Sequence, residues 1–133
     1  MAKHNEIGRI GEDVATDFLR QKGFEIVLRN FRKPYGEIDI IATDPLGLLR
    51  FIEVKSVSWE TGDFEGSGVP HGTVRPEENV HPAKVKSLMR IIEAYLVSHE
   101  TRGEWQFDVL AVFLDTKSKK VRVRHLENLV LGS

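Results

Sequence analysis

The sequence contains no cysteine, and it has no long hydrophobic run. The absence of cysteine excludes disulfides, thiolate zinc sites and cysteine nucleophiles. The longest uninterrupted apolar run, Val109 to Leu114, is far shorter than the roughly 20 residues that a membrane span needs. The first residues, Met1 to Glu6, lack the apolar core of a secretion signal. We therefore expect a cytoplasmic protein that does not enter a membrane.

The sequence also lacks an excess of either charge, since 19 basic and 20 acidic residues give a formal net charge of -1. Any affinity for nucleic acid must therefore come from a local basic patch rather than from the charge of the whole molecule. At 133 residues, 41% of them hydrophobic, the chain is long enough to build one hydrophobic core and short for two. We expect a single domain over residues 1–133.

Hydrophobic periodicity predicts an α/β protein with the element order α-β-β-β-α-β-β. Apolar residues recur at helical spacing over residues 5–22 and again after Pro82, a residue that suits the first turn of a helix. Runs rich in β-branched and aromatic residues predict strands at residues 24–31, 37–43, 48–58, 105–114 and 121–124. Residues 59–79 lack periodicity and contain several glycines and prolines, so they predict a long loop. Loops of that length in compact domains are usually functional or mobile.

Charged residues lie inside two of the predicted strands, where acids are normally rare. They are Asp39 in one strand, and Glu53 and Lys55 in the next. Because side chains alternate along a strand, Glu53 and Lys55 share one face. If residues 45–47 form a three-residue hairpin loop, Asp39 lies opposite Glu53, with Cβ atoms about 4.5–5.5 Å apart. The same alignment places Glu37 opposite Lys55.

Two carboxylates at that distance repel each other unless a cation lies between them. Carboxylate oxygens, completed by water and substrate phosphate, are the usual ligands of Mg²⁺. Such an ion polarises a phosphoryl oxygen, while a neighbouring lysine such as Lys55 can orient or deprotonate water and offset developing charge. The pattern therefore favours metal-assisted phosphodiester hydrolysis. The alternative is a ladder of salt bridges among Glu37, Asp39, Glu53 and Lys55 on a solvated sheet face.

Two further charged residues lie at the borders of the apolar faces of the predicted helices. Glu12 lies at the edge of the first face, and Gly8 and Gly11 leave room beside it for something to approach. Lys84 lies at the edge of the second face, where its ammonium group could reach a phosphate. Each of the two also fits an ordinary surface residue, so the helix positions alone do not assign a role.

Several short motifs, taken in order, carry a resemblance to a known family. They are Gly8-x-x-Gly11-Glu12, Asn30-x-Arg32, Gly36-Glu37-Ile38-Asp39, Phe51-Ile52-Glu53-Val54-Lys55, Lys84 and Phe107-Asp108-Val109. The set resembles the YraN-type family of predicted bacterial endonucleases, in the restriction-endonuclease-like superfamily of PD-(D/E)xK nucleases. The nearest relatives in layout are the archaeal Holliday-junction resolvases. This resemblance implies a restriction-endonuclease-like fold, a central mixed β-sheet flanked by helices.

The resemblance also implies roles for the matched residues. Asp39 would be the motif aspartate, Glu53 and Lys55 the E-x-K pair, and Glu12 the acid of the first helix, which makes these four the candidate catalytic residues. The carboxylates of Asp39 and Glu53, with the backbone carbonyl of Val54, would bind Mg²⁺ or Mn²⁺.

These observations predict a magnesium-dependent deoxyribonuclease that acts on structured or branched DNA. Arg32, Lys33 and Lys84 are the candidates for contacts with the nucleic-acid backbone. Resolution of a branched substrate needs two active sites, so we expect a homodimer in that case. Two alternatives stay open: a catalytically inactive adaptor in DNA processing that binds a protein partner through residues 59–79, or an RNA nuclease.

Overall fold

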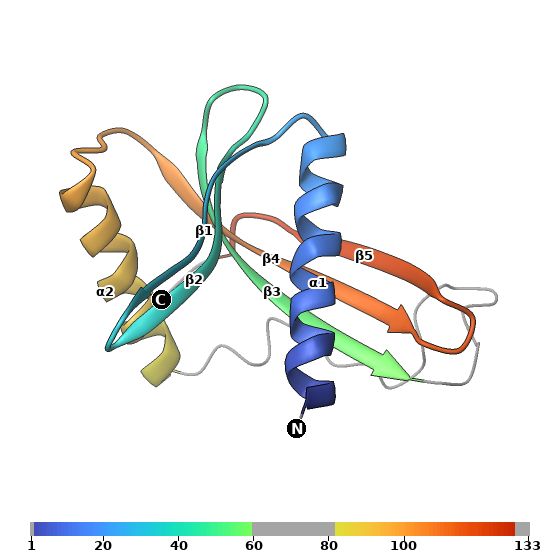
Figure 1. Ribbon diagram of the computed structural model, residues 1–133. Helices are drawn as coiled ribbons and strands as arrows, with labels where there is room; N and C mark the ends of the chain where they lie inside the picture. The colour runs from blue at the N-terminus through green and yellow to red at the C-terminus, as the bar shows by residue number, and fades with distance from the viewer. Residues whose placement is uncertain (1, 60–81, 130–133) are drawn as a thin grey trace.

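A computed structural model of the chain describes residues 2–59 and 82–129. The elements follow the predicted order, namely α1 (Ala2–Gln21), β1 (Glu25–Lys33), β2 (Gly36–Thr43), β3 (Leu49–Trp59), α2 (Pro82–Ser98), β4 (Trp105–Asp115) and β5 (Lys120–Leu126). The strands form one sheet in the order β1-β2-β3-β4-β5, with α1 and α2 on opposite faces (Figure 1). The predicted α/β architecture is therefore confirmed. The predicted loop lies outside the described residues, apart from Trp59, which ends β3.

The sheet is mixed because β3 and β4 run parallel while the other neighbouring strands run antiparallel. Parallel neighbours need a crossover connection, and α2 lies in the connection between β3 and β4. β4 lies between β3 and β5 and is buried from Phe107 to Asp115. In the described part of the chain, neither helix has the length and hydropathy needed to cross a membrane.

Two apolar clusters, one on each face of the sheet, hold the helices in place. The cluster under α1 contains Ala15, Leu19, Phe24, Ile40, Ala42, Ile52, Leu110, Val112 and Leu114. The cluster under α2 contains Ile38, Ile41, Phe51, Leu88, Ile91, Ile92, Tyr95, Phe107 and Val109. Neighbours such as Phe51 and Ile52 fall in different clusters, as the alternation of side chains along a strand requires. Each fully buried large apolar side chain contributes about 1.5–3 kcal/mol to this packing.

The β2–β3 hairpin has the predicted register, but its ladder is short. The paired residues are Ile40 with Ile52, Ile41 with Phe51, Ala42 with Arg50 and Thr43 with Leu49. Gly47, with φ of 90°, supplies the left-handed residue that the turn requires. The ladder ends at the Ile40–Ile52 pair, so the predicted pairs Asp39–Glu53 and Glu37–Lys55 do not form.

Beyond that last pair, β2 stays paired with β1 and β3 stays paired with β4. The two strand pairs turn away from each other, as the cyan end of β2 and the green β3 show in Figure 1. We call the opening between them the fork. Asp39 and Glu53 are the first residues on its two sides, so the fork brings together the acids that the hairpin alignment singled out.

Candidate active site

Asp39 lies where the two strands separate, and it replaces the next pair of the ladder with a side-chain contact. Its Oδ2 accepts a hydrogen bond of 2.7 Å from the backbone N–H of Val54. Burial raises the pKa of Asp39 to about 7 despite this bond, and the nearby acids Glu12, Glu53 and Glu37 raise it further. The surroundings of Asp39 therefore disfavour its negative charge unless a cation compensates it.

Glu53 is the second acid of the fork and is buried, with 8% of its surface exposed. Its Oε2 contacts two ammonium groups, Lys55 Nζ at 3.1 Å and Lys84 Nζ at 3.0 Å. Lys55 follows Glu53 on the same face of β3, whereas Lys84 comes from the first turn of α2. Two positive groups from different elements thus meet at one oxygen of a buried carboxylate.

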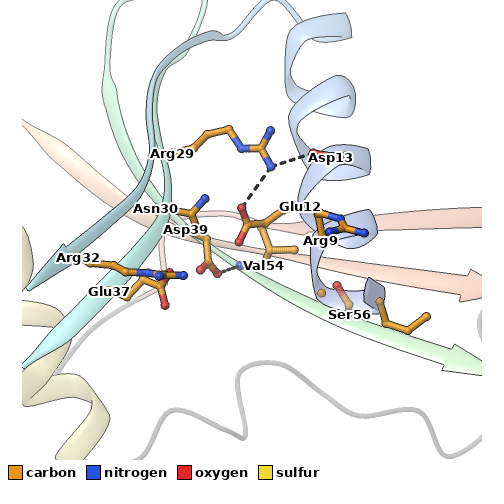
Figure 2. A pocket seen from close by; sticks show the side chains of 12 residues that line it. Arg9, Glu12, Asp13, Arg29, Asn30, Arg32, Glu37, Asp39, Val54 and Ser56 are labelled. Atoms are coloured by element: carbon orange, nitrogen blue, oxygen red, sulfur yellow. Dashed lines mark hydrogen bonds and ion pairs between the residues drawn. The ribbon is translucent and has the colours of Figure 1, made fainter. Parts of the chain in front are cut away.

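Two hollows in the surface meet at the fork. The α1 hollow, of about 820 Å³, lies between α1 and the sheet (Figure 2), and the α2 hollow, of about 440 Å³, lies on the α2 side. Glu37, Asp39 and Val54 line both hollows. Asp39 therefore lines hollows on both sides of the sheet.

Glu12 enters the α1 hollow from α1 and is held there by Arg29. Arg29 Nη2 donates to Glu12 Oε1 at 3.2 Å and to Asp13 Oδ1 at 2.9 Å (Figure 2). Gly11 allows α1 to come this close, because a Cβ at Gly11 would lie 1.8 Å from Ser56 Oγ on β3. The space expected beside Gly11 is thus filled by the sheet itself.

The three predicted nucleic-acid contacts lie in different places. Lys84 lines the α2 hollow and contacts Glu53. Arg32 lines the α1 hollow with 70% of its side chain exposed, and its Nε donates to Glu37 Oε2 at 2.8 Å. Lys33 lines neither hollow, and its ammonium group lies 5.6 Å from the centroid of the Phe31 ring. The structure therefore brings Lys84 and Arg32 to the fork, but not Lys33.

Other residues of the α1 hollow received no role from sequence reasoning, among them Arg9, Asn30 and Ser56. Asn30 has φ of 56°, in the left-handed region that asparagine tolerates better than most residues. Two signals were available for Asn30, its position inside a predicted strand and its place in the Asn30-x-Arg32 motif. Arg9 gave no signal, because an arginine on a helix surface is ordinarily solvated.

The oxygen donors at the fork fit a hard divalent cation. Asp39 uses Oδ2 for the Val54 bond, which leaves Oδ1 without a hydrogen bond to any described residue. Glu53 supplies a second carboxylate, and among the described residues the flexible side chains of Lys55 and Lys84 offset its charge. Mg²⁺ prefers oxygen ligands from one or two carboxylates, with the remaining positions left to water and phosphate. The donor set and its access from two hollows match that preference.

A second group of candidate ligands in the described residues does not fit a metal. Asp108, His125 and Glu127 lie close enough to share an ion. Arg50 already supplies the positive charge between these acids, since its Nη1 lies 2.8 Å from Asp108 Oδ2 and 2.6 Å from Glu127 Oε1. Asp44 binds the other side of the same guanidinium group, Nη2, at 2.8 Å. We interpret this cluster as a structural network of ion pairs.

Comparison with known proteins matches residues 11–112 to the model of the uncharacterised protein family UPF0102. A UPF0102 protein from Flavobacterium psychrophilum is 34% identical over 128 residues, which cover 96% of each chain. A UPF0102 protein from Desulforamulus reducens is 32% identical over 124 residues, covering 92% of this chain and 93% of the relative. One from Campylobacter concisus is 37% identical over 105 residues, covering 79% and 81%. The segment matched by the family model includes the residues for which the sequence predicted a role, namely Glu12, Arg32, Lys33, Asp39, Glu53, Val54, Lys55 and Lys84.

Proposed function

The chain belongs to the UPF0102 family, also called the YraN family, and from this premise we propose that it is a divalent-cation-dependent endonuclease of structured or branched DNA. The observation that supports the proposal is the meeting of Asp39, Glu53 and Lys55 where β2 and β3 separate. Acids that lie close together inside a sheet repel each other and lower the stability of the fold. A site that binds a cation for catalysis would explain why the chain has them there.

In this proposal the carboxylates of Asp39 and Glu53, with the backbone carbonyl of Val54, hold Mg²⁺ or Mn²⁺. The ion supplies positive charge to a phosphoryl oxygen and to an attacking water molecule. These groups lie where the two hollows meet, and in this proposal the nucleic acid would follow the hollows along the sheet.

The other residues act on water and on the phosphate. Lys55 places an ammonium group beside Glu53, where it offsets the negative charge that develops on the phosphate. Glu12 carries a carboxylate into the α1 hollow, where it orients a water molecule while Arg29 holds it in place. Arg32 and Lys84 lie on the two sides of the fork, where they contact phosphates of the backbone. A branched substrate is cut on two strands, so the proposal includes a homodimer for that reaction.

Cleavage assays on four-way, flap and linear DNA, with Mg²⁺ or Mn²⁺, test the proposal. We expect Asp39→Ala and Lys55→Ala to lower the cleavage rate by roughly 100-fold or more. Lys86→Ala is the matched control, because Lys86 is an exposed lysine of α2 that lines neither hollow. Equal cleavage by the wild-type protein and both site variants would contradict the proposal. Binding of DNA without cleavage by the wild-type protein would support an inactive adaptor instead.

A further inference from the structure

The contact between Glu53 and two lysines raises the question of how a cation reaches this carboxylate. Lys55 Nζ and Lys84 Nζ both lie within 3.1 Å of Glu53 Oε2, the group that the proposed metal needs. One carboxylate and two ammonium groups leave a net positive charge. An incoming cation therefore competes with two ammonium groups for the same oxygen.

The two lysines differ in how freely they can leave Glu53. Lys55 is two residues further along the same strand, and β3 holds it on the face of Glu53 through pairing with β4. Lys84 is carried by a different element, α2, and 39% of its side chain is exposed. Both lysines have the same flexible side chain, but Lys84 comes from outside the sheet and is the more exposed of the two, since 31% of the Lys55 side chain is exposed. Lys84 can therefore move away without disturbing the sheet.

The position of Lys84 on α2 points to an anionic partner. It is the third residue of the helix, and no acidic residue is present in that first turn. The N-terminal end of a helix carries partial positive charge, so a lysine there is disfavoured unless an anion offsets it. Glu53 is the anion that Lys84 contacts among the described residues. Another anion in the α2 hollow, such as a phosphodiester, would serve equally well.

We propose that Lys84 is a displaceable counter-ion of Glu53. In the free protein Lys84 pairs with the Glu53 carboxylate. When a divalent cation binds that carboxylate, Lys84 moves away and pairs with a phosphate of the nucleic acid. This inference rests on the proposed function and adds a regulation of the same site. Cation binding is weak while Lys84 has no other anion to contact. It is strengthened when a phosphodiester enters the α2 hollow, so the cation and the DNA bind cooperatively.

Binding of Mn²⁺ in the absence of nucleic acid, measured by electron paramagnetic resonance of the free ion, tests the first part. We expect Lys84→Met to bind Mn²⁺ roughly tenfold more tightly than the wild-type protein, a difference of about 1.4 kcal/mol. Lys84→Arg keeps the charge and Lys86→Met removes an exposed lysine outside the hollow, so both variants are expected to bind as the wild type does. Equal or weaker binding by Lys84→Met would overturn the inference while leaving the metal site in place. Failure of every protein to bind Mn²⁺ would overturn the proposed function itself.

The second part is tested by the effect of a cation on DNA affinity, because coupling between two ligands is reciprocal. The probe is a fluorescently labelled duplex with phosphorothioate linkages, titrated by anisotropy with and without Ca²⁺. We expect Ca²⁺ to strengthen binding to the wild-type protein by several-fold more than to Lys84→Met. The same factor for both proteins would show that Lys84 does not couple the two ligands.

Discussion

Single residues at the fork carry charges that the surrounding fold does not favour. Asp39 is the clearest case, because burial raises its pKa to about 7 from an ordinary value of 3.8. The Val54 N–H that it accepts lowers the pKa and does not fully offset the burial. A carboxyl group in such a position contributes little to stability at neutral pH, and the proposed role in a functional site gives a reason for its presence.

Replacing Asp39 by asparagine should therefore stabilise the folded protein above neutral pH. Because the folded-state pKa is raised, the protonated acid favours folding at low pH, and this contribution is lost as the pH rises from about 4 through 7. The asparagine stays neutral and can still accept the Val54 N–H. Urea unfolding should show Asp39→Asn about 1–3 kcal/mol more stable than the wild type at pH 8, and nearly equal to it near pH 4. The same difference at both pH values would contradict the burial of a charge at this position.

Some of the site could be predicted from residue patterns and some could not. Acids inside strands drew attention to Asp39 and Glu53, and the turn at Gly47 gave the correct register of β2 and β3 as far as the Ile40–Ile52 pair, although the predicted Asp39–Glu53 pair does not form. The end of the ladder at Ile40 was not predictable, because it depends on how far each strand pair twists away from the other. The contact of Lys84 with Glu53 was also beyond the sequence, since it requires the packing of α2 against the sheet.

At the scale of elements, the position of α1 against β3 is set by one glycine. A Cβ at Gly11 would meet Ser56 Oγ at 1.8 Å and Ser56 Cβ at 2.9 Å, whereas a Cβ at Gly8 meets nothing within 4 Å. The two glycines lie on the same helix, so they make a matched pair for substitution. Sequence reasoning identified both positions, but it could not distinguish the packed glycine from the open one.

Alanine at these two positions should have opposite effects. Gly8→Ala is expected to stabilise the protein by about 0.5–1 kcal/mol, because alanine favours a helix interior. Gly11→Ala should destabilise it by about 1–3 kcal/mol, since α1 must move away from β3. It should also slow cleavage, because Glu12 moves with the helix. Thermal unfolding of both variants checks the two predicted changes in stability. A Gly11→Ala protein as stable as the wild type would contradict the close packing of α1.

A second element-level feature is the ion-pair network that joins the β2–β3 turn to β4. Asp44 lies in the turn and Asp108 lies on β4 with 0% of its surface exposed, and Arg50 links them. Burial opposes the charge of Asp108, yet hydrogen bonds from His125, Arg50 and other donors hold its pKa at about 2. Asp108, in the Phe107-Asp108-Val109 motif, therefore stabilises the fold through this network. The sequence analysis had given it no function.

Loss of Arg50 should be far more damaging than loss of an exposed charge. Arg50→Met leaves the carboxylates of Asp44 and Asp108 buried without their common partner. We expect the free energy of unfolding to fall by about 3–5 kcal/mol at pH 7. The difference should shrink as the pH falls below about 4, because the acids then become protonated in the unfolded chain and in the variant. Chemical denaturation of the wild type and of Arg50→Met at pH 7 and below about pH 4 measures the difference in the free energy of unfolding. A loss below about 1 kcal/mol at pH 7 would show that the network does not hold the turn.

The whole molecule is nearly neutral, so the proposed binding of nucleic acid must depend on a few local charges. The periodicity of the sequence predicted every described element in the correct order, because each helix or strand buries one apolar face or lies wholly in the core. The distribution of charge over the folded surface was less predictable. Arg32 and Lys33 are neighbours in the sequence, yet of the two only Arg32 lines the α1 hollow.

This difference gives a prediction about salt dependence. Arg32→Ala should weaken DNA binding and reduce the slope of log affinity against log salt by about 1, the effect of losing one phosphate contact. Lys33→Ala removes the adjacent charge and should leave the slope nearly unchanged. Anisotropy titrations of a duplex at several salt concentrations measure both slopes. Equal changes for the two variants would indicate that DNA does not follow the α1 hollow.

The proposed function depends on one ion being shared between the two sides of the fork. A crystal of the wild-type protein soaked in Mn²⁺ and measured at the manganese absorption edge would locate that ion. We predict an anomalous peak about 2.0–2.3 Å from carboxylate oxygens of both Asp39 and Glu53, with Lys84 Nζ moved away from Glu53. No peak at the fork, or a peak only at the Asp108–His125–Glu127 cluster, would contradict a metal-dependent nuclease site at this position.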